Sequence, residues 1–176
     1  MKFEVSDPIP FTLDEAFSLI RDRMPTLVPY MRDTESIEVV SRSDDGDQTL
    51  IVNRWRASQE RVPKMLRSVI KPELLSWLDH ARWSEEQKAA HWTLEAMSGQ
   101  DLFSCSGVTS LFVQNDQTFL KIEVNLEIYP ERVPGVPKLL ARKIGGQIEK
   151  FLGDLLSDNM RQLAKSMSDY ARDHQS

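Results

Sequence analysis

The chain has 176 residues, with 22 Lys and Arg against 27 Asp and Glu and a formal net charge of −5. This length suits a single domain, 1–176, with a substantial core, and the acidic balance argues against a nucleic-acid partner. The single cysteine, Cys105, excludes an internal disulfide, and no window holds the roughly 18 apolar residues of a membrane span, so we expect a cytoplasmic protein.

The N-terminal segment predicts a strand followed by a helix. Residues Lys2–Asp7 alternate between apolar and polar side chains, and Pro8 and Pro10 are expected to end this strand. The sequence Thr12–Glu15 then has the pattern of a capping box, in which the side chains of the first and fourth residues bond each other's backbone N–H groups. We therefore expect a helix that continues to Arg23.

Six further segments predict strands that follow one another as hairpins. Turn residues separate them at Asp44–Asp47, Ser84–Gln87, Ser98–Gln100 and Asn115–Asp116. One segment, Leu74–Trp83, also fits a helix, and we prefer the strand because a short loop leads from it into another alternating segment. The six strands are predicted over residues 34–42, 49–57, 74–83, 88–97, 103–113 and 118–129.

The C-terminal segment predicts one long amphipathic helix. It begins near Pro137, which suits a first helical turn, and it runs to Ala171 without another proline. Because its apolar residues recur at steps of three and four, they form one face. That face comprises Leu140, Ile144, Ile148, Phe151, Leu152, Leu155, Leu156, Met160, Leu163, Met167 and Tyr170.

An antiparallel sheet with one apolar face needs a cover, and this helix is the only predicted element that is long enough. We therefore predict an α+β fold, in which a curved seven-stranded antiparallel sheet wraps around the long C-terminal helix. A cavity can remain between the two layers. The helix glycines Gly145, Gly146 and Gly153 fit either room for a ligand or a simple packing clearance.

Over the whole chain, this order of elements resembles that of the START-like (SRPBCC) superfamily. Its members share the helix-grip fold and include the birch-pollen allergens. Leu50–Arg56, followed by Arg61–Leu66 and Ile70–Pro72, is in addition similar to the strand and lid of PRELI-type phospholipid-transfer proteins. These resemblances imply one START-like domain that binds or transfers a lipid or another hydrophobic small molecule without a cofactor.

Residues 54–71 form a basic segment that is predicted to lie partly outside the sheet. Six basic residues stand here against one acid, Glu60, and apolar residues are interleaved with them. One interpretation is a lid that rests on an anionic membrane surface and opens the cavity. The other is a solvated loop whose apolar side packs on the sheet. The lid residues of the first interpretation are Arg61, Lys64, Met65, Arg67, Ile70 and Lys71.

One acidic residue is predicted on the sheet face that is directed toward the helix. The loop Ser84–Gln87 pairs Asp79 with Trp92 and Trp77 with Leu94. A carboxylate on that face must be paired, hydrogen-bonded or protonated. Asp79 is therefore a polar anchor or an acid–base group for a ligand, or else a rim residue or a sign that the register is shifted.

The same register pairs His80 with His91 on the outer face, near Glu95. Zinc needs three or four fixed ligands and no third is evident, so we predict no metal site. Cys105 lies in a strand without the partners of a catalytic nucleophile, and we expect it to be a small buried filler.

Three functions remain open, and we expect binding rather than catalysis. The first is a carrier or binder of a lipid or other hydrophobic molecule, and the second is an enzyme of the same fold, polyketide-cyclase-like, with Asp79 as its best candidate group. The third is an interaction module without a cavity. The pocket residues of the first function are Trp55, Trp77, Asp79, Trp92, Leu94, Leu120, Ile144 and Ile148.

Overall fold

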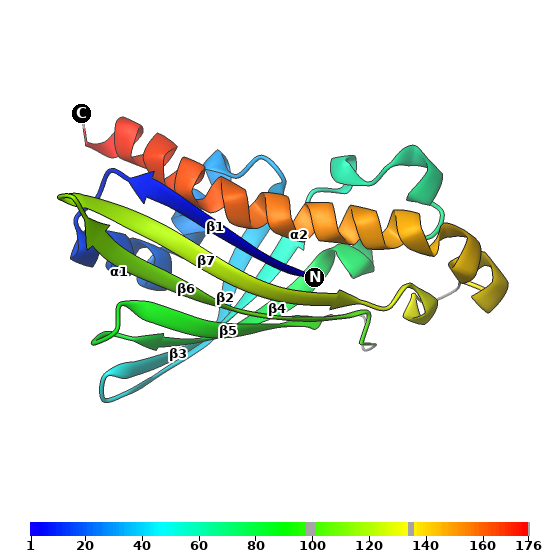
Figure 1. Cartoon of the computed structure of the whole chain (residues 1–176), viewed down its shortest axis with the longest axis horizontal. Helices are drawn as coiled ribbons and strands as arrows, with labels where there is room; N and C mark the ends of the chain where they lie inside the picture. Colours follow the sequence, from blue (N-terminus) through cyan, green and yellow to red (C-terminus); the bar gives the residue numbers. More distant parts are fainter. Residues whose placement is uncertain (98–100, 134–135, 176) are drawn as a thin grey trace.

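The computed structural model describes residues 1–97, 101–133 and 136–175. Within them the chain forms a curved seven-stranded antiparallel sheet with one long helix lying along it (Figure 1). The strand order is β1–β7–β6–β5–β4–β3–β2, so the first two strands of the chain form the two edges. The strands are β1 (Lys2–Ile9), β2 (Thr34–Asp45), β3 (Gln48–Ala57), β4 (Ser76–Ser84), β5 (Ala89–Ala96), β6 (Phe103–Gln114) and β7 (Gln117–Ile128).

Helix α1 (Leu13–Asp22) follows β1, and helix α2 (Lys138–His174) ends the chain. The predicted α+β helix-grip architecture is therefore confirmed. None of the helices in the described ranges, α2 included, is both long and apolar enough to cross a membrane. Short 3₁₀ helices connect the other elements: η1 (Met24–Tyr30), η2 (Gln59–Arg61), η3 (Lys64–Leu66), η4 (Pro72–Leu75) and η5 (Pro130–Arg132).

Local sequence signals explain most element boundaries. Thr12 and Glu15 form the predicted capping box at the start of α1. Asn115 and Asp116 both have positive φ, 49° and 59°, as a two-residue type I′ hairpin turn requires. The end predicted for the first strand is wrong, because β1 passes through Pro8. An edge strand has one side without sheet partners and therefore tolerates a residue that lacks an N–H.

The loop between β4 and β5 begins one residue later than predicted. Ser84 pairs with Ala89, and Lys88, the last loop residue, takes a φ of 50°. Because the loop moves by one position, the pairing of the two strands moves by two, which leaves each side chain on its predicted face. The turn predicted at Ser98–Gln100 lies outside the described residues.

Helix α2 covers the sheet with the apolar face that its sequence predicts. Ile148 and Met167 are fully buried, whereas Leu140, near the N-terminal end of that face, is 40% exposed. Each fully buried side chain of this size contributes roughly 1.5–3 kcal/mol, so this face holds the helix on the sheet. Gly153 lies where a Cβ would come 3.3 Å from Met1 Cε, which indicates packing clearance at this glycine.

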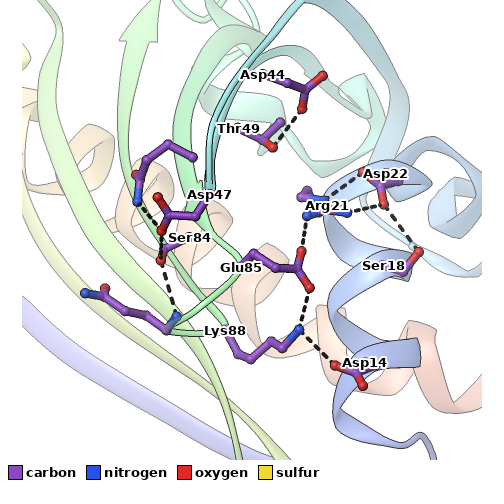
Figure 2. A network of polar contacts seen from close by, with 12 residues as sticks. Asp14, Ser18, Arg21, Asp22, Asp44, Asp47, Thr49, Ser84, Glu85 and Lys88 are labelled. Atoms are coloured by element: carbon purple, nitrogen blue, oxygen red, sulfur yellow. Dashed lines mark hydrogen bonds and ion pairs between the residues drawn. The ribbon is translucent and has the colours of Figure 1, made fainter.

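A network of polar contacts fixes α1 against the β4–β5 loop (Figure 2). Arg21 of α1 donates hydrogen bonds to Asp22 and to Glu85 in that loop. Lys88, at the end of the loop, forms ion pairs with Glu85 and with Asp14 of α1. These contacts anchor α1 to the loop that joins β4 and β5, the two strands that carry three of the four tryptophans described below.

Candidate functional site

A cavity lies between the inner face of the sheet and α2. Its volume is about 80 Å³, which is room for several water molecules, since one water needs roughly 10–15 Å³ on this measure. Five strands, η1 and α2 contribute to its wall. The wall residues are Met24, Trp55, Trp77, Asp79, Ala81, Trp83, Trp92, Leu94, Thr109, Ile122, Leu156, Asn159, Met160 and Leu163.

All four tryptophans of the chain line this cavity. Trp55 and Trp77 are paired across β3 and β4 and stack, with 6.2 Å between ring centroids and an interplanar angle of 11°. Trp83 packs edge-on against Phe17 of α1, and the Trp92 indole N–H donates to Thr109 Oγ1 at 3.0 Å. A wall of this composition favours apolar ligands.

Asp79 is the only ionisable side chain among these wall residues. Burial raises the pKa of Asp79 to about 7, and the Trp55 indole and the charge of His80 counteract that rise. Its Oδ1 has less than 1 Å² of accessible surface and no hydrogen-bond partner, and the Trp55 N–H forms no hydrogen bond of normal geometry with it. Asp79 therefore gains and loses its proton near neutral pH.

Asn53 lies directly opposite Asp79 on β3 and is buried. Its Oδ1 also lacks a hydrogen-bond partner. A carboxyl group donates a hydrogen bond when it is protonated and only accepts when it is ionised. Burial favours the neutral form of Asp79, and only that form donates a hydrogen bond.

Four wall residues carry buried polar atoms that no other described group satisfies. They are the indole nitrogens of Trp55 and Trp83, Oδ1 of Asp79, and both amide atoms of Asn159. Each unsatisfied group costs roughly 1–3 kcal/mol. Because the atoms are covered, a ligand reaches them only when neighbouring side chains shift. The wall therefore offers donors and acceptors in an otherwise apolar setting.

The structure brings five of the eight predicted pocket residues together in this wall. These are Trp55, Trp77, Asp79, Trp92 and Leu94. The other three, Leu120, Ile144 and Ile148, do not belong to the wall; Leu120 and Ile148 are buried in the surrounding core.

Asn159 was not predicted as a site residue, although a signal for it exists in the sequence. It stands between Leu156 and Leu163 on the apolar face of α2, where a polar residue has no packing role. Thr109 was not predicted either, and only the position of Trp92 reveals its role as a hydrogen-bond acceptor.

The register predicted for β4 and β5 is wrong by two residues. Asp79 pairs with Leu94 rather than with Trp92, and Trp77 pairs with Ala96 rather than with Leu94. Even so, Asp79 and the tryptophans lie on the cavity face, because a shift of two preserves the alternation of side chains.

The histidine pair predicted on the outer face does not form. His80 pairs with Thr93, and His91 pairs with Arg82. His80 Nε2 instead lies 2.8 Å from Glu95 Oε2. The described residues contain no group of three or more His, Cys, Asp or Glu side chains placed to hold a metal ion.

The thiol of Cys105 is buried near Asp79. Burial and the charge of Asp79 raise the pKa of Cys105 to about 12. A thiol with so high a pKa is not a nucleophile at neutral pH.

A larger hollow on the outer face, lined by His80 and Arg82 among others, includes none of the described buried polar atoms that lack partners.

The six predicted lid residues lie outside the cavity wall. Ile70 is buried, and Arg67 Nε donates to the Val62 carbonyl at 3.1 Å. Lys64 and Lys71 are exposed, and Met65 is 66% exposed. The apolar side of this segment thus packs inward, with Met65 as an exception.

Arg61 connects this segment to the body of the protein. Its Nη2 lies 2.7 Å from Asp158 Oδ2 on α2, and its Nε lies 3.2 Å from Oδ1 of the buried Asp33. Gln162 Nε2 donates to the other oxygen of Asp33 at 2.6 Å. Arg61 is therefore a latch between the segment and α2 rather than a free surface charge.

Solved structures of the helix-grip kind resemble the whole chain. TTHA0849 from Thermus thermophilus is 21% identical, with a TM-score of 0.69 and full coverage of both chains. The Zhui aromatase/cyclase from Streptomyces sp. R1128 is 11% identical, with a TM-score of 0.64 over 100% of this chain and 96% of that one. Ara h 8.0201 is 18% identical, with a TM-score of 0.50 over 93% and 97%.

Identities this low show a likeness of fold alone, and in fold they confirm the predicted resemblance to helix-grip proteins. No curated protein matches the sequence. The family model described as "Protein of unknown function (DUF2505)" matches residues 4–170, and the chain therefore belongs to that family.

Proposed function

We propose that this protein binds a compact hydrophobic molecule in the cavity between the sheet and α2. The observation that carries the proposal is the composition of the wall: four tryptophans and several aliphatic side chains surround a small number of polar groups without partners. Binding sites for small molecules combine an apolar wall with a few polar groups in this way. A long lipid chain requires the cavity to widen, because the present space has room for only several water molecules.

The four indole N–H groups provide a direct test, because every tryptophan of the chain lines the cavity. We expect ethylbenzene to shift the indole cross-peaks in a ¹H–¹⁵N correlation spectrum in a saturable way. A folded protein whose indole cross-peaks do not respond to saturating ethylbenzene contradicts the proposal.

A blocking variant makes the test specific. Ala81 lies in the wall between Asp79 and Trp83 and is 4% exposed. Ala81→Leu adds three carbon atoms to the cavity and should abolish the response. Ala96→Leu, on the neighbouring strand and outside the wall, is the matched control and should leave the response intact.

A second candidate function is acid–base catalysis by Asp79. Its pKa of about 7 suits a group that takes and returns a proton at neutral pH, and one structural neighbour is an aromatase/cyclase. Asp79 would then remove a proton from the carbon next to a bound carbonyl group and return it. In D₂O we expect the wild type to exchange the methyl protons of acetophenone faster than Asp79→Asn does; equal rates exclude this candidate.

Contact of the 61–71 segment with an anionic membrane is a further proposal for how a ligand reaches the cavity. It rests on Lys64, Met65 and Lys71, which are exposed to solvent. Basic residues near an anionic surface contribute about 1 kcal/mol each. Liposome flotation should weaken in Lys64→Glu with Lys71→Glu, and unchanged flotation removes this proposal.

A further inference from the structure

The cavity wall offers no positive charge to a ligand. None of its residues is Lys, Arg or His, and its one ionisable side chain, Asp79, is an acid. A ligand carboxylate or phosphate would lose its hydration without gaining a counter-charge, and it would face Asp79. Such burial of an unpaired charge is strongly unfavourable, so the wall disfavours anions.

A cation is also disfavoured, although Asp79 and four aromatic rings are present. Cations bind over the faces of aromatic rings. The rings of Trp55 and Trp77 stack on each other, and Trp83 packs against Phe17, so these three rings are already engaged with aromatic neighbours. A cation also accepts no hydrogen bond, and it would leave the indole N–H groups without partners.

The unsatisfied groups of the wall are mainly donors. The indoles of Trp55 and Trp83 only donate, and the Asn159 amide brings two N–H donors with one acceptor. Asp79 becomes a donor when it is protonated. The ligand that satisfies most of these groups at once is one with accepting oxygen atoms and no net charge.

We infer that the cavity selects an uncharged compound with an apolar body and a hydrogen-bond-accepting carbonyl oxygen, which Trp55, Trp83 and the neutral form of Asp79 bind. This inference rests on the proposed function and narrows it to a class of ligand. Carbonyl oxygens of ketones, esters and lactones share the required chemistry.

Four probes of nearly equal size test the inference: acetophenone, ethylbenzene, benzoate and benzylammonium. Each is titrated at pH 7 into ¹⁵N-labelled protein, with the indole cross-peaks as the readout. We expect acetophenone to bind about tenfold tighter than ethylbenzene, which is the factor that one hydrogen bond of ordinary net strength supplies. Benzoate and benzylammonium should bind more weakly than ethylbenzene.

Two aromatic variants separate hydrogen bonding from packing. Trp55→Phe removes the indole N–H and keeps an aromatic ring, so the preference for acetophenone over ethylbenzene should fall from about tenfold to about threefold or less. Trp77→Phe is the matched control. Trp77 lies in the same wall, stacked on Trp55, and its nitrogen is not among the buried atoms without partners, so the preference should persist.

The outcomes are distinct. Equal affinity for ethylbenzene and acetophenone overturns the inference and leaves the proposed function intact. Tightest binding of benzylammonium also overturns it and assigns the cavity to organic cations. A folded protein that binds none of the four probes overturns both the inference and the proposed function.

Discussion

The indole ring of Trp92 lies over Gly107, the residue paired with it on the next strand. A Cβ at Gly107 would come within 2.3 Å of Trp92 Cζ2 and within 2.3 Å of the Glu123 carbonyl oxygen. Both contacts are far shorter than a side chain tolerates. The position of Trp92, and with it one side of the cavity, therefore depends on the absence of a single methyl group.

We predict that Gly107→Ala lowers the free energy of unfolding by about 2–3 kcal/mol, the usual cost of forcing extra atoms into a packed core, and moves the Trp92 indole cross-peak. Urea denaturation measures the change. Gly146→Ala is the control, because nothing lies within 4 Å of its Cβ position in α2. It should stabilise the protein by up to about 1 kcal/mol. Equal stability of the two variants would contradict the close contact.

Asp79 makes stability depend on pH in a predictable direction. Its pKa is raised from 3.8 to about 7 in the folded protein, so between these values the folded chain holds a proton that the unfolded chain has lost. Its contribution is therefore complete below about pH 4, declines as the pH rises, and is gone above about pH 7. The loss is about 4 kcal/mol.

Asp79→Asn removes this titration and keeps the shape of the side chain. We predict that the stability of Asp79→Asn relative to the wild type increases from pH 4 to pH 8, measured by urea denaturation at each pH. Asp45→Asn, at the exposed end of β2, is the control for the loss of one surface carboxylate. A constant difference between Asp79→Asn and the wild type would show that Asp79 does not change its pKa on folding.

We predict that the Asn159 side chain lowers the stability of the free protein and contributes to ligand binding. Asn159 is 8% exposed and its amide has no partner at either polar atom, so Asn159→Leu should raise the free energy of unfolding by about 1–2 kcal/mol. The same variant should weaken the binding of acetophenone. Met160→Leu, on the same wall, removes no donor or acceptor and should change stability by less than about 1.5 kcal/mol. A destabilised Asn159→Leu protein would argue that the amide has a structural role.

Arg61 should control the mobility of the 61–71 segment. Arg61→Gln leaves the buried Asp33 without its ion pair and should cost about 1–3 kcal/mol. Trypsin should then cleave faster at Lys64 and Arg67. Lys64→Gln removes an exposed charge from the same segment and should change stability by less than about 0.5 kcal/mol. An unchanged cleavage rate in Arg61→Gln would argue against the latch.

The sequence predicts the architecture because its signals are local and redundant. The alternation in Thr118–Tyr129 assigns the faces of β7 without knowledge of its neighbours, and the capping box and the turn at Asn115–Asp116 mark their boundaries independently. Alternation also places Asp79 on the correct face of β4 even though the predicted register is wrong. Two-residue errors are invisible to a pattern of period two.

The cavity itself could be predicted only in part. Its volume is the small difference between the space enclosed by the sheet and α2 and the volume of the side chains that fill that space. Whether space remains near Ala81 depends on where Trp83, Trp92 and α2 come to rest, and no local pattern encodes that. Asn159 shows the same limit. One polar residue on an apolar helix face is informative only when its neighbours are known to leave both amide atoms without a partner.

Crystals soaked in 4-bromoacetophenone provide the most direct test of the proposed binding site, because bromine is located by its anomalous scattering. We expect the bromine inside the wall between the sheet and α2, with the carbonyl oxygen at hydrogen-bond distance from Trp55, Trp83 or Asp79. We expect no such peak in Ala81→Leu crystals. Bromine found only on the outer surface of saturated wild-type crystals would contradict it.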